Sequence, residues 1–274
     1  MTSLSIIMPA YNEERTLAQA VDEVLAVDYP CSVELIVIDD GSTDRTSGIL
    51  DRYESTGVTV VRQSRNMGKG AAVRAGVERA RGTHLIIFDA DLEYCPTDIP
   101  TLLAPVIAGV ADHVFGTRVF GLNTRFQSFK FAVGGRATTL AANIIFDSCL
   151  TDMHTCLKLI PRQEFLSLNL RERGFGLDTQ LTAQLLSRGV RPYEVPVTYR
   201  GRSVADGKKI NWRDGVRCLL LLLHIRLTYR PALASGLLGV PVAPADERPL
   251  GDSTTTAEMV AAGNAGRTGS HVPA

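Results

Sequence analysis

The sequence is poor in the features that mark several common protein classes. Of its 274 residues, one is Trp and five are Cys, and the cysteines form no CxxC pair. Their scattered spacing excludes a disulfide framework or a cysteine-rich zinc site and is typical of reduced thiols in the cytosol. Lys plus Arg and Asp plus Glu each total 29, so the formal net charge is zero. We therefore predict no nucleic-acid partner, and any electrostatic recognition must come from local clusters.

Long hydrophobic runs are also missing. The longest strongly apolar run, Cys218–Leu223, is followed closely by His224 and Arg226, whereas a membrane span needs about 20 apolar residues. The first residues, Met1–Met8, lack the basic start and long apolar stretch of a signal peptide. We expect a cytoplasmic protein without a membrane span, and peripheral attachment to a membrane stays compatible with the sequence.

What the sequence does contain is an alternation of apolar and helical stretches over its first 120 residues. It predicts strands at Leu4–Met8, Val33–Asp39, Val58–Arg62, His84–Phe88 and His113–Thr117. It predicts helices between them, at Thr16–Ala26, Thr43–Glu54, Gly70–Ala80 and Thr97–Gly109. This rhythm is typical of right-handed βαβ crossovers. We expect an α/β fold in which helices flank a mostly parallel central sheet.

The pattern changes after residue 120. It predicts a helix at Gln127–Phe146, interrupted by a Gly-Gly pair, a further helix at Asp178–Ser187, and a proline-containing edge strand at Val190–Tyr199. Residues 235–274 are rich in Ala, Gly, Thr, Ser and Pro and show no periodicity, which indicates a disordered tail. We expect one domain over residues 1–230.

Two aspartates follow directly after the fourth predicted strand. Asp89 and Asp91, separated by one small residue, suit a hard divalent cation bound through oxygen, such as Mg²⁺. Polar clusters also follow the first predicted strand ("PAYNEE") and the second ("DDGSTD"). Because ligands bind beyond the carboxyl ends of parallel strands, these three clusters indicate a single site. The alternative is a solvated turn whose acids cap the next helix.

Two further stretches suit a nucleotide. In "VIDDGSTDRT" a carboxylate such as Asp40 can accept hydrogen bonds from a base or ribose, and a helix-capping role for Ser42 or Thr43 fits equally well. In "RNMGKGAAVRAG" glycines and Lys69 precede a helix, so backbone N–H groups and one cation would face a phosphate. This stretch lacks the GxxxxGK[ST] pattern, which argues against an ATP-type loop, and a plain turn is the alternative.

Basic residues gather in the second half of the chain. Four of them fall within Arg200–Lys209, a loop that also contains two glycines. The whole set is Arg118, Arg136, Arg200, Arg202, Lys208 and Lys209. A basic, mobile loop above an acidic metal site is suited to closing on phosphates. A solvated surface loop is the alternative.

One helical candidate, Ile210–Tyr229, is dominated by apolar residues and carries Trp212 near its start, with basic residues interspersed. Such a helix suits a membrane interface, where Trp and Arg lie at the level of the lipid headgroups. A helix buried against the domain or a dimer partner fits equally well, and the sequence leaves the oligomeric state open. Among the histidines, only His154, close to Asp152, is a candidate functional residue.

Seven motifs occur in one order: "SIIMPAYNEE", "ELIVIDDGSTD", "RNMGKGAAVRAG", "DADLEYCPTDIPTLL", "GTR", "TDMHTCLKL" and "EVPVTYRGR" followed by "GKKI". Together they resemble family-2 glycosyltransferases of the GT-A fold over roughly Ser3–Leu227. They look most like the dolichol-phosphate mannose synthase group, the polyprenyl-phosphate sugar transferases. Relatives without transmembrane helices reach lipid through an interfacial helix, which favours that role for Ile210–Tyr229.

The resemblance implies a metal-dependent, inverting glycosyltransferase. The implied donor is GDP-mannose or a UDP-sugar, the acceptor is a polyprenyl or dolichyl phosphate, and the cofactor is Mg²⁺ or Mn²⁺. The implied place of action is the cytoplasmic face of a membrane, to which the protein would attach peripherally.

The resemblance also implies roles for single residues. Positions that hold the base and ribose match Pro9, Tyr11, Glu13 and Asp40. The DxD metal ligands match Asp89 and Asp91, and a third position near the metal matches Glu93. Positions that bind acceptor or donor phosphates match Arg118, Arg136, Arg200 and Lys208, and Arg202 lies in the same basic loop. Asp152 falls where many family-2 enzymes keep a general base.

Two kinds of acceptor stay open. A lipid phosphate is already ionised at neutral pH, so positioning and charge neutralisation would carry catalysis, and Asp152 would orient groups. A saccharide or small-molecule hydroxyl would need Asp152 as general base. A sugar nucleotidyltransferase is a more distant alternative, since no glycine-rich loop follows the first predicted strand. A catalytically inactive membrane-binding module is disfavoured by the retention of Asp89, Asp91, Arg118 and Lys208.

Overall fold

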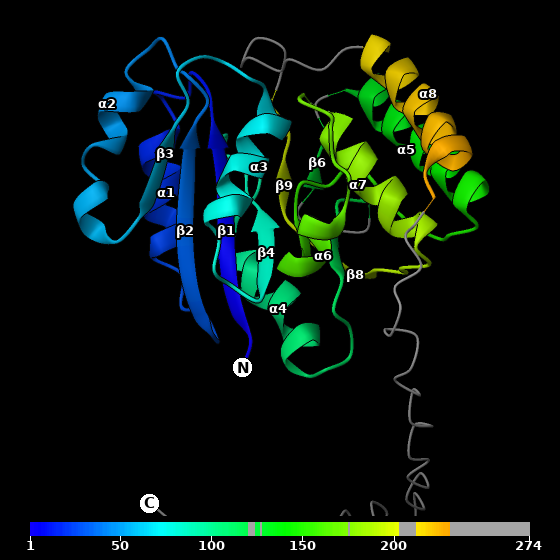
Figure 1. Cartoon of the computed structure of the whole chain (residues 1–274), viewed down its shortest axis with the longest axis horizontal. Coiled ribbons are helices and arrows are strands. Elements are labelled where there is room, and N and C mark those ends of the chain that lie inside the picture. Colours follow the sequence, from blue (N-terminus) through cyan, green and yellow to red (C-terminus); the bar gives the residue numbers. More distant parts are fainter. Residues whose placement is uncertain (120–123, 127, 175, 203–211, 231–274) are drawn as a thin grey trace, which may run out of the picture. The chain divides into compact units, whose positions relative to one another are not determined.

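The computed structural model of the chain describes residues 1–119, 124–126, 128–174, 176–202 and 212–230, all within one compact unit, Met1–Pro231 (Figure 1). The strands are β1 (Ser3–Ala10), β2 (Ser32–Asp39), β3 (Thr59–Arg62), β4 (His84–Ile87), β5 (Val114–Thr117), β6 (Thr124–Arg125), β7 (Lys158–Pro161), β8 (Tyr193–Pro196) and β9 (Tyr199–Arg200). The helices are α1 (Leu17–Leu25), α2 (Thr46–Leu50), α3 (Lys69–Arg79), α4 (Ile99–Ile107), α5 (Phe129–Phe146), α6 (Arg162–Ser167), α7 (Gly176–Ser187) and α8 (Trp212–Thr228), with 3₁₀ turns η1 (Glu54–Thr56) and η2 (Pro96–Asp98).

The main sheet has the order β3-β2-β1-β4-β7-β5-β8, and each of its strand pairs is parallel except the two that involve β7. In β1, Leu4, Ile6, Ile7 and Met8 are all buried, as expected for a parallel strand that is covered on both faces. The predicted mostly parallel sheet is therefore confirmed, and β8 lies at its edge as predicted. A second, two-stranded sheet pairs β6 with β9.

Helices cover both faces of the main sheet. Because successive side chains of a strand point to opposite faces, Ile6 and Met8 join one core cluster, to which α1, α2 and α4 contribute, and Ile7 joins the other. That second cluster receives side chains from α3, α5, α6, α7 and α8. In Figure 1, α8 runs beside α5, and the two helices are in contact. The result is a three-layer α/β arrangement with the expected helices on both sides.

Strand β7 was not predicted. It inserts antiparallel between β4 and β5, with Leu159 opposite Ile86 on one side and Val114 on the other. Its four residues "KLIP" begin with a lysine and follow the polar stretch "TDMHTC" after a single residue, Leu157. Sequence periodicity cannot identify so short a strand, because its burial comes from two neighbours that are distant in the chain.

Three predicted elements differ from the observed ones. Helix α5 runs without a break through Gly134–Gly135, because its packing outweighs a cost of about 1 kcal/mol per glycine. The predicted helix Thr43–Glu54 shrinks to α2 and η1, and the predicted strand Val190–Tyr199 divides into β8 and β9 around two residues. The basic segment 203–211 and the tail predicted over residues 235–274 lie outside the described residues.

Candidate active site

The three predicted polar clusters do meet at the carboxyl edge of the sheet. The backbone N–H of Asn12, after β1, donates to Ser42 Oγ at 3.0 Å, and the N–H of Glu13 donates to Thr46 Oγ1 at 2.9 Å. Ser42 and Thr46 follow β2, so the ends of the two strands are joined by hydrogen bonds. Ser42 therefore ties two loops together, whereas the side chain that bonds the Thr46 N–H at the start of α2 is Asp44, at 2.9 Å.

A cavity of ≈ 410 Å³ lies beyond the ends of β1, β2 and β3. Its lining includes Tyr11, Asp39, Gly41, Arg62, Gln63 and residues 64–66. Gly41 has φ +69°, and a Cβ on it would lie 2.4 Å from the carbonyl carbon of Arg65, so only glycine fits this turn. Of the residues predicted to hold a base and ribose, Tyr11 lines this cavity, and Pro9, Glu13 and Asp40 are not among its lining residues.

Asp40 instead holds the following glycine-containing loop. Its two carboxylate oxygens accept the backbone N–H groups of Met67 at 2.7 Å and Gly68 at 2.8 Å. Burial raises the pKa of Asp40, and these two hydrogen bonds act against that rise. Its neighbour Asp39 lines the cavity. The sequence marked both acids as the end of a strand and contained no signal for which of them faces the cavity.

Acids from the ends of β1 and β4 form a cluster together with one arginine. Arg202 Nη2 lies 2.7 Å from Asp91 Oδ2, and its Nη1 lies 3.5 Å from Glu13 Oε2. The backbone N–H of Arg202 donates to Glu93 Oε1 at 2.7 Å. Glu13, Asp91 and Glu93 thus share Arg202 as a partner, so Glu13, predicted among the residues that hold a base and ribose, lies with the acids of the predicted metal site.

Burial and neighbouring acids disfavour the charged form of Asp91. Its burial, with the nearby charges of Asp89 and Glu93, raises its pKa to about 7, although Arg202 acts in the opposite direction. A bound cation would relieve this repulsion. Within the described residues no three His, Cys, Asp or Glu side chains converge as in an all-protein metal cage. Mg²⁺ needs only one or two carboxylates and takes its other ligands from water and phosphates, so Asp89 and Asp91 fit such an ion.

Lys69 lies in a buried row of alternating charges. Its Nζ is 2.8 Å from Asp89 Oδ2 and 3.7 Å from Asp178 Oδ2, and Lys158 Nζ is 3.5 Å from Asp178 Oδ1. The thiol of Cys156 also donates to Asp89 Oδ2, at 2.9 Å. Burial alone would lower the pKa of Lys69, but Asp89, Cys156 and Asp178 hold it well above its usual value. Lys69 therefore orients and neutralises Asp89, and neither Lys158 nor Asp178 was predicted as a site residue.

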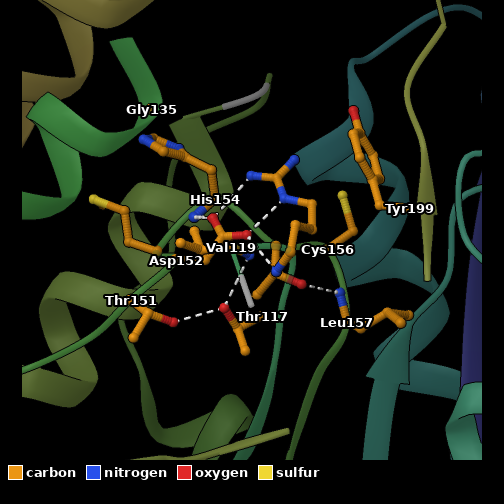
Figure 2. A network of polar contacts seen from close by, with 12 residues as sticks. Thr117, Val119, Gly135, Thr151, Asp152, His154, Cys156, Leu157 and Tyr199 are labelled. Carbon is orange, nitrogen blue, oxygen red and sulfur yellow. Dashed lines mark hydrogen bonds and ion pairs between the residues drawn. The ribbon is translucent and has the colours of Figure 1, made fainter. Parts of the chain in front are cut away.

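Arg118 and Asp152 form a bidentate ion pair at the other end of the site (Figure 2). Arg118 Nε donates to Asp152 Oδ2 at 2.6 Å, and Nη2 donates to Oδ1 at 2.8 Å. The backbone N–H groups of Arg118 and His154 add hydrogen bonds of 3.2 and 3.1 Å to the same carboxylate. Burial would raise the pKa of Asp152, but the charge and hydrogen bonds of Arg118 outweigh it and lower the pKa.

His154 is a partly buried, neutral member of this network. Its Nε2 lies 2.6 Å from Thr138 Oγ1 of α5, and Figure 2 shows it between Asp152 and Gly135. Burial lowers its pKa to about 4, and Asp152 acts in the opposite direction. A neutral imidazole at this place links α5 to the loop that carries Asp152.

The remaining predicted basic residues lie apart from these contacts or outside the described residues. Arg136 is exposed on α5, and Arg200 is exposed on β9, where its backbone N–H donates to the carbonyl of Glu93 at 2.8 Å. Lys208 and Lys209 fall within residues 203–211, outside the described residues. Of the predicted basic set, Arg118 and Arg202 are therefore the members that the structure places in the site.

Tyr199 is an aromatic site residue that was not predicted from the sequence. Its hydroxyl donates to Glu93 Oε2 at 2.8 Å, and its ring centroid lies 4.9 Å from Cζ of Arg118. In the sequence, the only indication of a role for Tyr199 is its place directly before Arg200 in "EVPVTYRGR".

Comparison with known proteins identifies the family of this chain. The model of "Glycosyl transferase family 2" matches residues 5–156. The chain is 31% identical over 241 residues to "Glycosyltransferase AglJ" of Haloferax volcanii, covering 86% of this chain and 76% of that protein. It is 25% identical over 246 residues to "Dolichyl-phosphate beta-glucosyltransferase ALG5A" of Trichomonas vaginalis, covering 83% of this chain and 74% of that protein.

A similar solved structure has the same fold. Glucosyl-3-phosphoglycerate synthase from Mycobacterium tuberculosis, crystallised with Mn²⁺, UDP and glucosyl-3-phosphoglycerate, aligns with a TM-score of 0.60 and 22% identity, covering 82% of this chain and 80% of that one. This likeness supports the GT-A fold. With the family match over more than half of its length, the chain belongs to glycosyl transferase family 2 and is a glycosyltransferase.

Proposed function

We propose that this enzyme transfers a hexosyl unit from a nucleoside-diphosphate sugar, UDP- or GDP-linked, to a polyprenyl phosphate. The relative from Trichomonas vaginalis is named as a dolichyl-phosphate glucosyltransferase, which supports a lipid-phosphate acceptor. The Mycobacterium tuberculosis neighbour was crystallised with Mn²⁺ and UDP, which supports a nucleotide donor and a divalent ion.

The choice of acceptor rests on the hydrogen bonds and the lowered pKa of Asp152. Both of its oxygens already accept hydrogen bonds, from Arg118 and from the N–H of His154. Its lowered pKa makes it a weak base, whereas general-base catalysis on a hydroxyl needs a pKa near the working pH. An acceptor phosphate arrives ionised and needs no base. The geometry therefore favours a phosphate over a sugar hydroxyl.

Arg118 has N–H donors that can bind such a phosphate. Two of its nitrogens, Nε and Nη2, bind Asp152, whereas Nη1 donates to no acceptor among the described residues. A guanidinium can thus bind a carboxylate with one edge and a phosphate with the other, since it carries five N–H donors. Asp152 would serve as the anchor that fixes the direction of Arg118.

The reaction would be an in-line displacement at the anomeric carbon. A phosphate oxygen of the acceptor forms the new C–O bond while the bond to the donor diphosphate breaks, and the nucleoside diphosphate leaves with that electron pair. No proton has to move, and the configuration inverts. Arg118 would position the nucleophile, Tyr11 would lie against the nucleotide, and Lys69 would orient Asp89. A bound Mg²⁺ or Mn²⁺, held by Asp89 and Asp91 with Glu93 nearby, would supply charge neutralisation of the diphosphate.

The remaining basic residues have proposed roles at the phosphates. Arg202 would turn from Asp91 to a phosphate once a metal ion has taken its place. Arg136, Arg200 and Lys208 keep the role implied by the family resemblance, as acceptor-phosphate groups. Pro9, Glu13 and Asp40 would shape the nucleotide site, Asp40 by holding the loop at Met67 and Gly68.

An exposed apolar surface on two helices would bring the enzyme to its lipid substrate. Among the described residues no helix is both long and apolar enough to cross a membrane. Helices α5 and α8 pack against each other, and Arg226 Nε donates to the carbonyl of Ile145 at 3.2 Å. Each carries exposed large apolar side chains at helical spacing: Phe129, Val133, Leu140 and Ile144 on α5, and Val216, Leu219, Leu220, Leu223 and Leu227 on α8. We take this surface as the proposed contact with the cytoplasmic face of a membrane.

A transfer assay tests the acceptor. Purified enzyme with Mn²⁺ is offered UDP- and GDP-sugars together with farnesyl phosphate, a short prenyl phosphate, or with soluble glycosides. Formation of a prenyl-phosphate sugar supports the proposal, and transfer to glycosides alone contradicts it. The Asp152→Asn variant provides a second readout. Loss of a general base should cost a factor of about 10² to 10⁴ and remove the rising limb of the pH–rate profile, whereas loss of an anchor should mainly raise the acceptor KM.

A further inference from the structure

Tyr199 contacts both halves of the site with one side chain. It is 3% exposed, its hydroxyl donates to Glu93 Oε2 at 2.8 Å, and its ring lies 4.9 Å from Cζ of Arg118. Glu93 is two residues from Asp91 and belongs to the acid cluster, whereas Arg118 belongs to the acceptor side. Figure 2 shows Tyr199 beside the network that surrounds Asp152.

The side chain of Tyr199 has little freedom to move. Its ring lies 5.2 Å from that of Tyr94 and 5.7 Å from that of Phe126, measured between centroids. A Cβ on Gly201 would lie 3.0 Å from Cε1 of the ring, so the following turn also closes on it. Burial, followed by the charge of Glu93, raises the pKa of Tyr199, and the hydroxyl therefore stays a protonated donor at neutral pH.

We propose that Tyr199 is a positioning residue that holds Glu93 through its hydroxyl and Arg118 through the face of its ring. It thereby sets the separation between the acids that would hold a metal ion and the cation that would hold the acceptor phosphate. This inference rests on the proposed function for the identity of the two ligands. A hydrogen bond to a carboxylate and a cation–π contact are independent interactions, so they can be removed one at a time.

Two substitutions separate the two contacts. Tyr199→Phe removes the hydroxyl and keeps the ring, so it should weaken Mn²⁺ binding about 10-fold through Glu93, the low end of the range for residues that orient the surroundings of a metal ion, and leave farnesyl phosphate binding within about twofold. Tyr199→Leu removes both contacts, so it should also weaken farnesyl phosphate binding by roughly 3- to 10-fold, the order expected for a cation–π contact. Mn²⁺ binding is measured without nucleotide, and farnesyl phosphate binding by calorimetry.

Tyr53→Phe is the matched control. The hydroxyl of Tyr53 donates to Asp22 Oδ1 at 2.8 Å, a contact of the same kind away from the site residues. This variant should change neither affinity. Thermal melting of all variants reports general loss of structure. If Tyr199→Leu does not fold, Tyr199→Met tests the ring contact with a side chain that fills the space but has no π face.

A double variant tests whether the hydroxyl acts through Glu93. In a Glu93→Gln background, Tyr199→Phe should weaken Mn²⁺ binding by much less than 10-fold, because the two residues are coupled. The inference is overturned if Tyr199→Phe leaves Mn²⁺ affinity unchanged or strengthens it, or if both variants weaken both ligands by the same factor. Wild-type enzyme that binds Mn²⁺ but neither binds farnesyl phosphate nor glycosylates it would refute the proposed function instead, and the Mn²⁺ measurements would still decide the link to Glu93.

Discussion

Replacing Arg202 with alanine should make the acid cluster bind a divalent cation more tightly. Arg202 Nη2 lies 2.7 Å from Asp91 Oδ2, and Nη1 lies 3.5 Å from Glu13 Oε2. A guanidinium therefore neutralises the carboxylate that a metal ion needs. An ion that binds Asp91 has to displace Arg202, and the free energy of that displacement lowers its apparent affinity.

The size of the effect follows from the contact that is lost. A hydrogen bond between charged groups contributes about 1.5 to 3 kcal/mol, and the Arg202 and Asp91 side chains are only 24% and 16% exposed, so solvent screens this pair incompletely. At about 1.4 kcal/mol per factor of ten, the Kd for Mn²⁺ should fall roughly 10- to 100-fold in the variant.

Protonation of Asp91 would compete with Mn²⁺ for the carboxylate, so the pH of this measurement has to be chosen accordingly. Burial and neighbouring acids raise the pKa of Asp91 to about 7, and the charge of Arg202, with the backbone N–H of Glu93, opposes a further rise. Without Arg202 the carboxylate would hold a proton more tightly at neutral pH and so mask part of the gain. Titrations of Mn²⁺ at pH 8, followed by the paramagnetic resonance signal of the free ion and without nucleotide, reduce this competition.

Arg200→Ala is the matched control for this prediction, because Arg200 is two residues away and exposed. It should leave Mn²⁺ affinity unchanged. Unchanged or weaker Mn²⁺ binding by Arg202→Ala would refute the idea that the guanidinium competes with the metal ion. In the presence of Mn²⁺ the same variant should raise the KM for the nucleotide sugar, because the arginine is then needed at a phosphate.

Three further predictions test other parts of the site. Asp91→Asn should nearly abolish sugar transfer while the melting temperature stays within a few degrees of wild type; near-normal turnover would refute the metal assignment. His154, whose pKa falls from 6.5 to about 4 on burial, binds a proton more readily in the unfolded chain. Stability should therefore drop by roughly 3 kcal/mol as the pH falls from 6.5 to 4, and denaturant unfolding of His154→Asn should lack this component. Leu220→Glu, at a position 63% exposed on α8, should weaken co-sedimentation with anionic lipid vesicles without changing Mn²⁺ affinity.

Much of the fold could be predicted because its first half follows a regular rhythm. The five predicted strands and four predicted helices of that half each correspond to an observed element, with shifted ends. Strand β7, in contrast, is buried by β4 and β5, which lie far from it in the sequence. Its Leu159 pairs with Ile86, 73 residues earlier, and its Lys158 pairs with Phe115, 43 residues earlier. Local periodicity carries no information about such neighbours.

The candidate site was also predictable only in part. Its place could be predicted, because polar residues after parallel strands collect at one sheet edge. The orientation of single side chains could not. Asp39 and Asp40 are adjacent, yet Asp39 lines the cavity and Asp40 binds the N–H groups of Met67 and Gly68. Lys69 resembled a phosphate ligand, but its partner Asp178 lies on α7, more than a hundred residues along the chain.

The acceptor is where the structure adds most to the sequence. An aspartate at position 152 fits a general base and an anchor equally well, because the two roles use the same side chain. They differ in what surrounds the carboxylate: a base needs a free oxygen and a pKa near neutrality, and an anchor needs a fixed cation. Arg118, whose Nε lies 2.6 Å from Asp152, provides that cation and lowers the pKa. Because a carboxylate so occupied is a poor proton acceptor, the same ion pair would, under the proposed function, disfavour a hydroxyl acceptor and orient Arg118 for a phosphate.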